Sequence, residues 1–381
     1  MRALASLRTC GAITPIKNAD VIETAHVDGW TCVVKKGEFK PGDTGIYFEI
    51  DSFLPADDDR YAFLAKDFRD FKDPNDNFTL VRGARLRTMT LRKQLSQGLF
   101  LPLSSFPELA DVLVGTDVTE ILGIRKWEAP IPNELEGSVL GALPSYIKTT
   151  DQERIQNLMT VLDTDIIGRT FEKSIKLDGT SMTVYFSNRT VEAGHVGVCG
   201  RNWEYARGNH FTLGGFIKRG EWWKAFKALF QWKKYAEKED NTYFKVADDL
   251  NLIEALRDYG RNIAVQGELV GPGIQGNVEL MKDHEFYIFD VWDIDDHRYL
   301  SPVEREDLIQ DLEAHAAGDL KQVPVLESTT FLVDTTVESI LATADGPSIN
   351  QPKREGVVYK RDDGKFSFKA ISNSYLMAET D

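Results

Sequence analysis

Cysteine and histidine are scarce in this sequence, and their scarcity limits the metal and redox sites that it can build. The 381 residues include three cysteines and six histidines. Cys10, Cys32 and Cys199 are too few and too scattered for a disulfide framework or a structural zinc site. No His-Glu-x-x-His run is present, so a dedicated zinc-enzyme motif is also excluded.

Long apolar runs are missing as well. No stretch approaches the roughly 18 apolar residues of a membrane span. The N-terminal segment MRALASLRTCGAI lacks an apolar stretch long enough for a signal peptide. We therefore expect a cytoplasmic protein with no membrane partner.

The charge is unbalanced toward acid, while the rest of the composition is that of an ordinary globular protein. Lys and Arg number 45 and Asp and Glu 60, so the net charge is −15. This argues against nucleic-acid binding through overall charge but leaves room for a local basic groove. The length allows two or three domains of about 150 residues each.

The first third of the chain, residues 1–125, is rich in short β-type runs. The segments 30–39 and 44–55 flank a Lys-Pro-Gly-Asp turn at 40–43. Short strands with regular turns predict a small barrel or sandwich. The proline-containing segment 126–147 has no periodicity, and we expect a linker there.

The remainder, 148–381, mixes strands with helices. Capping boxes at Thr150–Glu153 and Ser301–Glu304 predict two helix starts. A further helix is expected over 243–260, ending at Gly260. Strands are expected at 171–186, 261–271, 285–294, 354–360 and 365–371.

One glycine pattern suggests a nucleotide site that its surroundings do not support. The segment 271–276 matches G-x-G-x-x-G, but Pro272 and the residues after it do not begin a helix. A dinucleotide fingerprint needs that helix because its N-terminus holds the pyrophosphate. We reject the dinucleotide interpretation, and the sequence also has no P-loop pattern.

The segment Lys176-Leu177-Asp178-Gly179 carries the sharpest chemical signal. It places a lysine at the end of a predicted strand, with a carboxylate two residues later and a glycine turn. Lysine becomes a nucleophile near neutral pH only when its surroundings free the amine. On its own the pattern favours a surface lysine beside a hairpin turn, because Asp-Gly is a common turn.

The order of the motifs that follow decides between these interpretations. Conspicuous residues come in the order Arg201, Glu268, Phe289, Glu355 and Lys369. With Lys176 they resemble the ordered motifs of covalent nucleotidyltransferases, the polynucleotide ligases and capping guanylyltransferases. The segments 148–158, 174–185, 266–277 and 367–376 look like one branch of these enzymes. That branch is the ATP-dependent RNA ligases of the Deinococcus and Naegleria type, which carry an N-terminal OB domain.

The resemblance implies an α+β architecture. An OB-type barrel at 1–125 would be followed, after the linker, by a nucleotidyltransferase domain of antiparallel sheets with flanking helices at 148–381. It also implies that Lys176 becomes a covalent lysyl-AMP, that Glu268 holds the ribose and that Phe289 stacks on adenine. Other residues expected at the ATP or AMP site are Lys148, Arg154, Ile175, Asp178, Gly179, Arg201 and Lys369.

The resemblance further implies a catalytic Mg²⁺ or Mn²⁺, with Glu355, Asp178 and Glu268 as its carboxylate set. Three departures from the family pattern stand out. Ser181 occupies a position that is often arginine, and Ile175 one that is often glutamate in other RNA ligases. Ser367 replaces the first lysine of a common Lys-x-Lys pair, which leaves Lys365 as the next lysine upstream.

Nucleic-acid binding is expected to be local. A basic stretch in the N-terminal domain could contact phosphates in a salt-sensitive way. It could equally be an edge strand blunted by charge. Its residues are Arg82, Arg85, Arg87, Arg92 and Lys93. A second candidate is the basic and aromatic segment 217–238.

We therefore expect a monomeric ATP-dependent RNA ligase. It would seal 3′-OH/5′-phosphate nicks in duplex RNA or RNA/DNA hybrids, with RNA on the 3′-OH side, in RNA repair. Two alternatives remain inside enzymes: a DNA ligase and a GTP-using capping enzyme. A third is a non-catalytic OB-type RNA-binding protein, against which the intact set of Lys176, Glu268, Glu355 and Lys369 argues.

Overall fold

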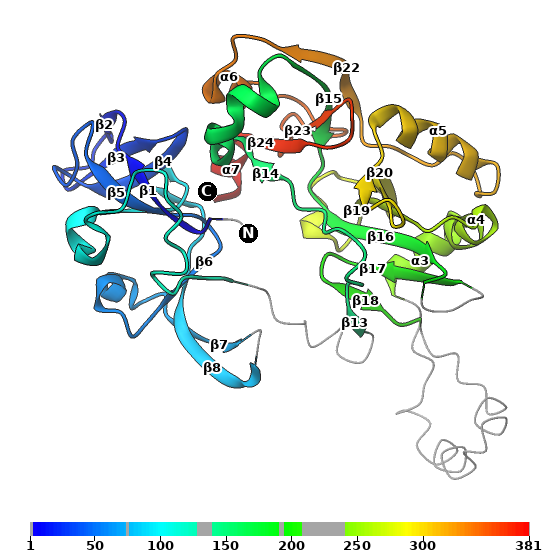
Figure 1. The fold of residues 1–381 in the computed structure, drawn as a ribbon, viewed down its shortest axis with the longest axis horizontal. Helices are drawn as coiled ribbons and strands as arrows, with labels where there is room; N and C mark the ends of the chain where they lie inside the picture. Colours follow the sequence, from blue (N-terminus) through cyan, green and yellow to red (C-terminus); the bar gives the residue numbers. More distant parts are fainter. Residues whose placement is uncertain (1–2, 74–75, 128–138, 190–193, 208–240, 381) are drawn as a thin grey trace.

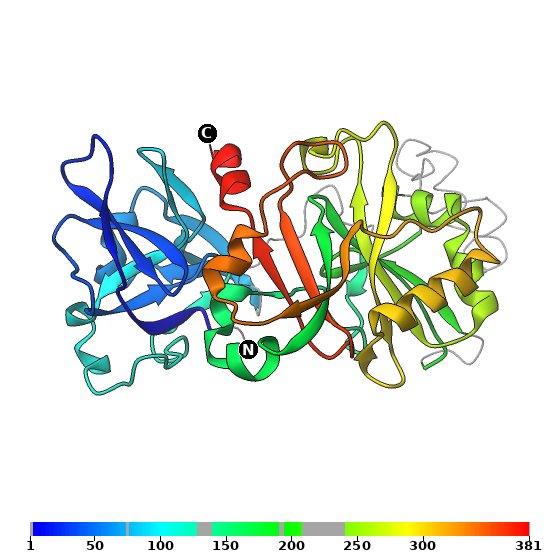
Figure 2. The ribbon, with the colours of Figure 1, turned by 90° about the horizontal axis from the view of Figure 1, so that it is seen from above.

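The computed structural model describes residues 3–73, 76–127, 139–189, 194–207 and 241–380. The N-terminal strands lie at one end of the molecule, and helices α4 (Leu252–Tyr259) and α5 (Pro302–Glu313) lie at the other (Figures 1 and 2). No helix in the described ranges is both long and apolar enough to cross a membrane.

The N-terminal domain consists of small antiparallel sheets, which agrees with the predicted barrel. One sheet contains β1 (Ala5–Thr9), β5 (Thr44–Phe48) and β11 (Leu99–Pro102), and another contains β2 (Ile13–Pro15), β3 (Ile22–Val27) and β4 (Trp30–Lys35). The remaining strands are β6 (Ser52–Pro55), β7 (Arg69–Asp73), β8 (Asp76–Arg85), β9 (Met89–Leu91), β10 (Gln94–Ser96) and β12 (Arg125–Lys126). The predicted turn at 40–43 joins β4 to β5, where the Asp43 N–H donates to the Lys40 carbonyl at 3.0 Å.

The larger domain contains two sheets. A seven-stranded sheet has the order β13 (Val139–Ala142), β18 (Trp203–Tyr205), β17 (His195–Cys199), β16 (Thr180–Ser187), β19 (Ile263–Val270), β20 (Glu285–Asp293) and β21 (Arg298–Tyr299). A five-stranded sheet has the order β14 (Glu153–Arg154), β24 (Ser367–Ile371), β23 (Gly356–Arg361), β15 (Arg169–Lys176) and β22 (Val325–Leu332). Helices complete the domain, so the α+β expectation is confirmed.

Each sheet buries one face under helices. Val184, Val265 and Ile288 of the larger sheet pack against helix residues such as Leu256 and Leu308. The smaller sheet packs beneath α6 (Val337–Ala342) through a separate apolar cluster. The other faces of the two sheets remain available to line a cavity between them.

Helix boundaries confirm part of the sequence prediction. Ser301 and Glu304 form the predicted capping box at the start of α5. The expected helix over 243–260 is two helices, α3 (Thr242–Asp249) and α4, separated at Asn251, whose φ is +51°. Gly260 ends α4 with a φ of +68°, as predicted.

The helix predicted from the Thr150–Glu153 capping box was wrong. Glu153 and Arg154 form β14, which pairs with β24, and a 3₁₀ segment follows over Ile155–Val161. The Thr150 hydroxyl lies 3.0 Å from the Ser181 hydroxyl rather than capping a helix. A competing tertiary partner thus overrode the local cap signal.

The segment predicted as a linker, 126–147, already contributes to both domains. Lys126 pairs with Ser52 in β6, while β13 pairs with β18 in the seven-stranded sheet. We therefore propose that the catalytic domain begins at 139 rather than 148.

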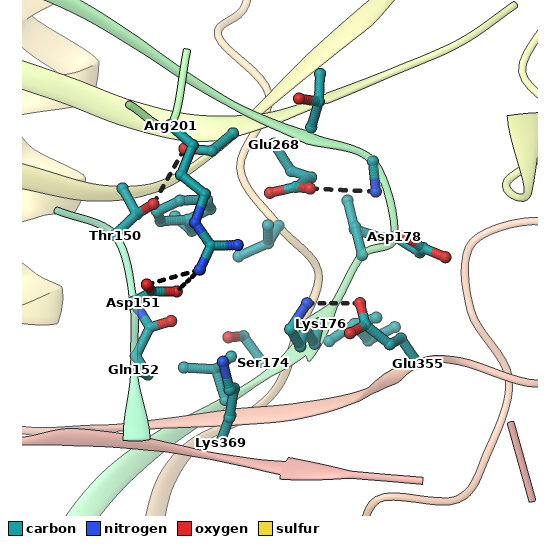
Figure 3. Close-up of a pocket in the computed structure, with 18 of the residues that line it drawn as sticks. Thr150, Asp151, Gln152, Ser174, Lys176, Asp178, Arg201, Glu268, Glu355 and Lys369 are labelled. Atoms are coloured by element: carbon teal, nitrogen blue, oxygen red, sulfur yellow. Dashed lines mark hydrogen bonds and ion pairs between the residues drawn. The ribbon is translucent and has the colours of Figure 1, made fainter. Parts of the chain in front are cut away.

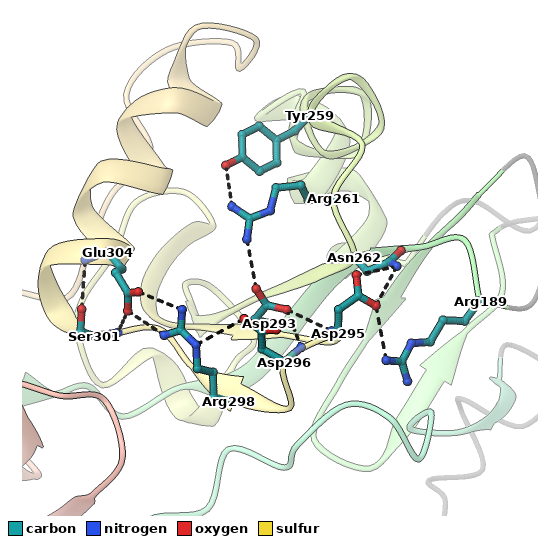
Figure 4. A network of polar contacts seen from close by, with 10 residues as sticks. All are labelled: Arg189, Tyr259, Arg261, Asn262, Asp293, Asp295, Asp296, Arg298, Ser301 and Glu304. Carbon is teal, nitrogen blue, oxygen red and sulfur yellow. Dashed lines mark hydrogen bonds and ion pairs between the residues drawn. The ribbon is translucent and has the colours of Figure 1, made fainter.

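A polar network fixes the turn between β20 and β21 and the start of α5 (Figure 4). The Arg298 guanidinium donates two hydrogen bonds to Glu304, at 2.8 and 2.9 Å. Asp293 accepts from the backbone N–H groups of Asp295 and Asp296, both at 3.0 Å. These contacts hold the end of β20, the strand that carries Phe289.

Candidate active site

A polar cavity of about 310 Å³ lies between the two catalytic sheets (Figure 3). The five-stranded sheet supplies Lys176 at the end of β15, Glu355 directly before β23 and Lys369 in β24. The seven-stranded sheet supplies Glu268 from β19 and Phe289 from β20. Residues far apart in the sequence thus meet where the ordered motifs predicted one site.

The Lys176 amine lies among carboxylates. Its Nζ donates to Glu355 Oε2 at 2.5 Å, and 24% of the side chain is exposed. Burial alone would lower its pKa, but the charges of Glu355 and Glu268 outweigh burial, and the pKa of Lys176 is raised. Among these carboxylates the amine therefore favours its protonated form.

The surrounding acids are held close enough to disfavour one another's charge. Burial raises the pKa of Glu268 to about 8, with Lys176 opposing and Glu355 reinforcing the shift. Burial and then Glu355 also raise the pKa of Asp178. An excess of partly buried carboxylates around one amine is a typical feature of a site that receives a cationic ligand.

The glycine turn brings two of these elements together. The Gly179 N–H donates to Glu268 Oε1 at 3.1 Å. A Cβ at Gly179 would lie 2.5 Å from the Leu269 carbonyl oxygen. Only glycine therefore allows the loop after the lysine to approach β19 this closely.

The donor set suits a divalent cation. Asp178, Glu268 and Glu355 all line the same cavity, and hard cations such as Mg²⁺ and Mn²⁺ prefer carboxylate oxygens. Within the described part of the chain, no three or more acidic, histidine or cysteine side chains are grouped so that they could hold a metal ion by themselves. An ion bound by these carboxylates would therefore keep several of its waters, as Mg²⁺ commonly does.

Phe289 reaches the cavity because of an irregularity in its strand. The pairing of β19 with β20 shifts register between Gln266 and Gly267, which oppose Asp290 and Ile288. Phe289 is thus the extra residue of a β-bulge, a feature that re-aims a side chain. It lines the cavity and is only partly buried, which favours the stacking role over a core role.

The predicted phosphate cations separate into two groups. Lys369 and Arg201 line the lysine cavity, and Figure 3 shows both reaching toward its centre. Burial, together with Lys176 and Arg154, lowers the pKa of Lys369 to about 8. Arg201 is bound to Asp151, with Nη2 2.5 Å from Oδ1.

Arg154 and Lys148 lie outside the lining of the lysine cavity. Arg154 opposes Lys369 in the β14–β24 pair, and its guanidinium lies 5.5 Å from the centre of the Trp30 ring in the barrel. Lys148 lines a neighbouring pocket with Lys365 and Ser367. Ile175 and Gly179 line the lysine cavity as expected.

Sequence reasoning missed several cavity residues because only tertiary pairing brings them in. Ser181, noted only as a departure, lines the cavity and contacts Thr150. The other lining residues that were given no role are Thr150, Asp151, Gln152, Ser174 and Lys360. All but Lys360 lie within the segments 148–158 and 174–185 that carry the family resemblance, but no motif in those segments assigned them to the site.

A second buried charge cluster adjoins the cavity behind Phe289. Lys360 donates to Asp290 at 2.7 Å and also to the Phe289 carbonyl. Arg305 donates to both carboxylate oxygens of Glu172, at 3.0 and 2.8 Å, and to the Phe289 carbonyl at 3.3 Å. Each cation in this cluster thus has a carboxylate partner.

The basic stretch of the barrel contains two arginines that pair with carboxylates and three other exposed cations. Arg85 donates to Asp51 at 2.8 Å and stacks over Trp127, and Arg82 pairs with Asp70. Arg87, Arg92 and Lys93 are exposed. The other predicted nucleic-acid segment, 217–238, lies outside the described residues.

Comparison with known proteins agrees with this geometry. A family profile described as an OB-fold domain matches residues 4–103, and one described as RNA ligase matches residues 169–371. A search of curated proteins gave no match.

The solved structures that resemble this one include Naegleria gruberi RNA ligase in several bound states. A variant with ATP and Mn is 49% identical over 98% of each chain, with a TM-score of 0.77. A variant with AMP and Mn is 49% identical over 99% of each chain, with a TM-score of 0.78. The form with PPi is 49% identical over 100% of each chain, with a TM-score of 0.77. This chain therefore belongs to the RNA ligase family.

Proposed function

We propose that this chain is an ATP-dependent RNA ligase that seals 3′-OH/5′-phosphate nicks in duplex RNA or RNA/DNA hybrids, with RNA on the 3′-OH side. The observation that carries the proposal is the Lys176 amine, held against Glu355 in a cavity that also presents Glu268 and Phe289. Related ligases crystallised with ATP, AMP and PPi support ATP as the nucleotide.

The first step forms a lysyl-AMP. The lone pair of Lys176 Nζ attacks the α-phosphorus of ATP, the amine loses its proton, and the bond to pyrophosphate breaks. The lysine must be deprotonated for this attack, whereas the carboxylates around it raise its pKa and favour the protonated form. A divalent cation bound by the nearby carboxylates would cancel the charges that retain this proton and offset the negative charge of the phosphates.

The remaining side chains orient the nucleotide. Phe289 offers a ring face to adenine, and Glu268 supplies acceptor oxygens for the ribose hydroxyls. Lys369 and Arg201 bring positive charge to the phosphates. Since Arg201 is bound to Asp151, a nucleotide that recruits it must compete with this carboxylate.

The next two steps use RNA. A 5′-phosphate oxygen attacks the lysyl-AMP phosphorus and frees Lys176, which produces an adenylylated RNA end. A 3′-hydroxyl then attacks that 5′-phosphate and releases AMP. Arg87, Arg92 and Lys93 supply exposed positive charge on the barrel for sequence-independent contact with the duplex backbone.

The experiment supplies singly nicked duplexes that differ only in the sugar at the 3′-OH end, together with ATP and Mn²⁺. We expect sealing with a ribose end and much weaker sealing with a deoxyribose end. Equal sealing of both ends would indicate a DNA-tolerant ligase. Labelling by GTP in preference to ATP would indicate a capping-type enzyme, and nick binding without any lysyl-AMP would indicate a non-catalytic RNA-binding protein.

A further inference from the structure

The last helix, α7 (Asn373–Thr380), follows β24 and lies between the N-terminal strands and the catalytic domain (Figures 1 and 2). Its first turn is firmly anchored. The Tyr375 N–H donates to the Ser372 hydroxyl at 3.0 Å, and Asp345 accepts from the hydroxyls of Ser372 and Ser374 at 2.5 and 2.9 Å. The position of this turn is therefore well defined by the catalytic domain.

Tyr375 extends from this turn to the acid that follows the nucleophile. Its hydroxyl donates to Asp178 Oδ2 at 2.5 Å, and only 6% of Tyr375 is exposed. Asp178 is thus held at one carboxylate oxygen, and none of the hydrogen bonds among the described residues uses its other oxygen.

The same turn is held by the barrel. Gln97 Nε2 donates to Asn373 Oδ1 at 3.1 Å. Gln97 is 1% exposed, its N–H donates to the Thr31 carbonyl at 2.7 Å, and its carbonyl accepts from the Tyr47 hydroxyl at 2.8 Å. The barrel therefore presents a rigid donor to the helix position two residues before Tyr375.

We propose that Tyr375 is a positioning residue that fixes the Asp178 carboxylate beside Lys176, and that α7 couples this carboxylate to the docking of the N-terminal barrel. The proposal rests on the proposed function in one respect, the assignment of Asp178 to a metal-binding carboxylate set. Groups that orient a ligating carboxylate typically change metal affinity when they are removed.

The chain offers a matched control for the tyrosine. Tyr185 also donates to a carboxylate, Glu204 Oε1, at 2.8 Å, but neither residue lines the lysine cavity. Tyr185→Phe therefore deletes the same kind of hydrogen bond elsewhere in the domain. Asn373→Ala removes the link to the barrel from a solvent-exposed helix position, so the variant should fold.

The first measurement is Mn²⁺ binding to the full chain without ATP, by calorimetry or electron paramagnetic resonance. We expect Tyr375→Phe to weaken Mn²⁺ binding by about 10-fold, within the range for groups that orient metal ligands. The Mn²⁺ concentration for half-maximal lysyl-AMP formation should rise in parallel, while the rate at saturating Mn²⁺ changes less. Wild-type affinity in Tyr375→Phe, or the same loss in Tyr185→Phe, would overturn the positioning role.

The second measurement tests the coupling. Asn373→Ala should weaken Mn²⁺ binding in the same direction but by less, and the double variant should show less than the product of the two single effects. Strictly multiplicative effects would overturn the link to the barrel. Mn²⁺ binding needs no turnover, so wild-type protein that forms no lysyl-AMP would contradict the proposed function while still allowing this inference to be tested.

Discussion

Two lysines on neighbouring strands line the same cavity, but their surroundings shift their pKa values in opposite directions. Lys176 ends β15 and contacts Glu355, with Glu268 and Asp178 close by, and its pKa is raised. Lys360 lies in the adjacent β23 and is paired with Asp290, and burial lowers its pKa. Side-chain exposure also differs, at 24% for Lys176 and 7% for Lys360.

The difference separates a reactive cluster from a structural one. Around Lys360 and Arg305, each cation has a carboxylate partner and the Phe289 carbonyl accepts from both. Around Lys176, carboxylates outnumber the cations that contact them, so the cluster retains capacity for a cation and a nucleotide. A lysine in such a cavity is therefore a candidate nucleophile when the carboxylates around it outnumber the cations. It is a structural residue when each cation has its own carboxylate partner.

The largest effect should come from the reactive lysine. Lys176→Ala removes the only amine assigned to attack ATP, so lysyl-AMP formation should fall by about 10³-fold or more. Trapping of α-labelled AMP on the denatured protein measures the loss. Unchanged thermal unfolding would show that the loss is chemical, and retention of label would contradict the assignment.

Removing an acid beside the nucleophile should have the next largest effect. Glu355→Gln removes one carboxylate from the proposed divalent-metal site beside Lys176. The rate of lysyl-AMP formation should therefore fall by about 10²-fold, as expected when the catalytic contribution of a metal ion is lost. Chelation of divalent metal from wild-type protein should produce a comparable loss that Mn²⁺ reverses. Glu327→Gln, which lies outside the cavity lining, is the control, and an equal loss there would contradict the site.

The structural lysine should affect stability instead. Lys360→Ala leaves Asp290 buried without its partner, which should cost about 3 to 5 kcal/mol of unfolding free energy. Urea unfolding measures this cost. The folded fraction should still form lysyl-AMP, and an intact stability with lost adenylylation would reverse the roles of the two lysines.

The reactive cluster should also show a pH signature in metal-free, nucleotide-free protein. Burial raises the pKa of Glu268 from 4.5 to about 8. Folding therefore favours the protonated carboxyl. The stabilisation that this proton gives the folded state is complete below pH 4.5 and is lost as the pH rises to about 8. Glu268→Gln should therefore gain stability relative to wild type across this window, by at most about 1.4 kcal/mol per pH unit. A difference that is flat with pH would contradict the prediction.

The smallest effect should be on RNA binding through the barrel. Arg87→Glu with Arg92→Glu reverses exposed charges, so affinity for a nicked duplex should fall and its salt dependence should become shallower. Arg85→Glu should instead destabilise the barrel, because Arg85 is bound to Asp51. Filter binding at several salt concentrations measures the first effect, and an unchanged affinity would place the nucleic-acid groove elsewhere.

Much of the site could be predicted from the order of its motifs. Lys176, Glu268 and Lys369 were identified because they follow the motif order of the covalent nucleotidyltransferases, and the structure brings them into one cavity. Asp151 and Lys360 were missed because their roles depend on which strands become neighbours. That information lies in the pairing of β14 with β24 and of β15 with β23.

Local signals predicted elements well only where no tertiary partner competed. The Ser301 capping box produced α5, whereas the similar box at Thr150 yielded a strand because Thr150 contacts Ser181 and Arg154 pairs with Lys369. The register shift that exposes Phe289 likewise depends on how β19 and β20 meet. No periodicity in the sequence specifies it.

Acidic surroundings, rather than a lowered pKa, mark the nucleophile. Lys369 provides the sharpest test, because its pKa of about 8 makes it easier to deprotonate than Lys176, whose pKa is raised. The decisive measurement incubates wild-type protein with ATP and Mn²⁺, digests it, and locates the added adenylyl group among the lysine peptides by mass spectrometry. We expect the group on Lys176 alone, and its presence on Lys369 or Lys360 would contradict this account.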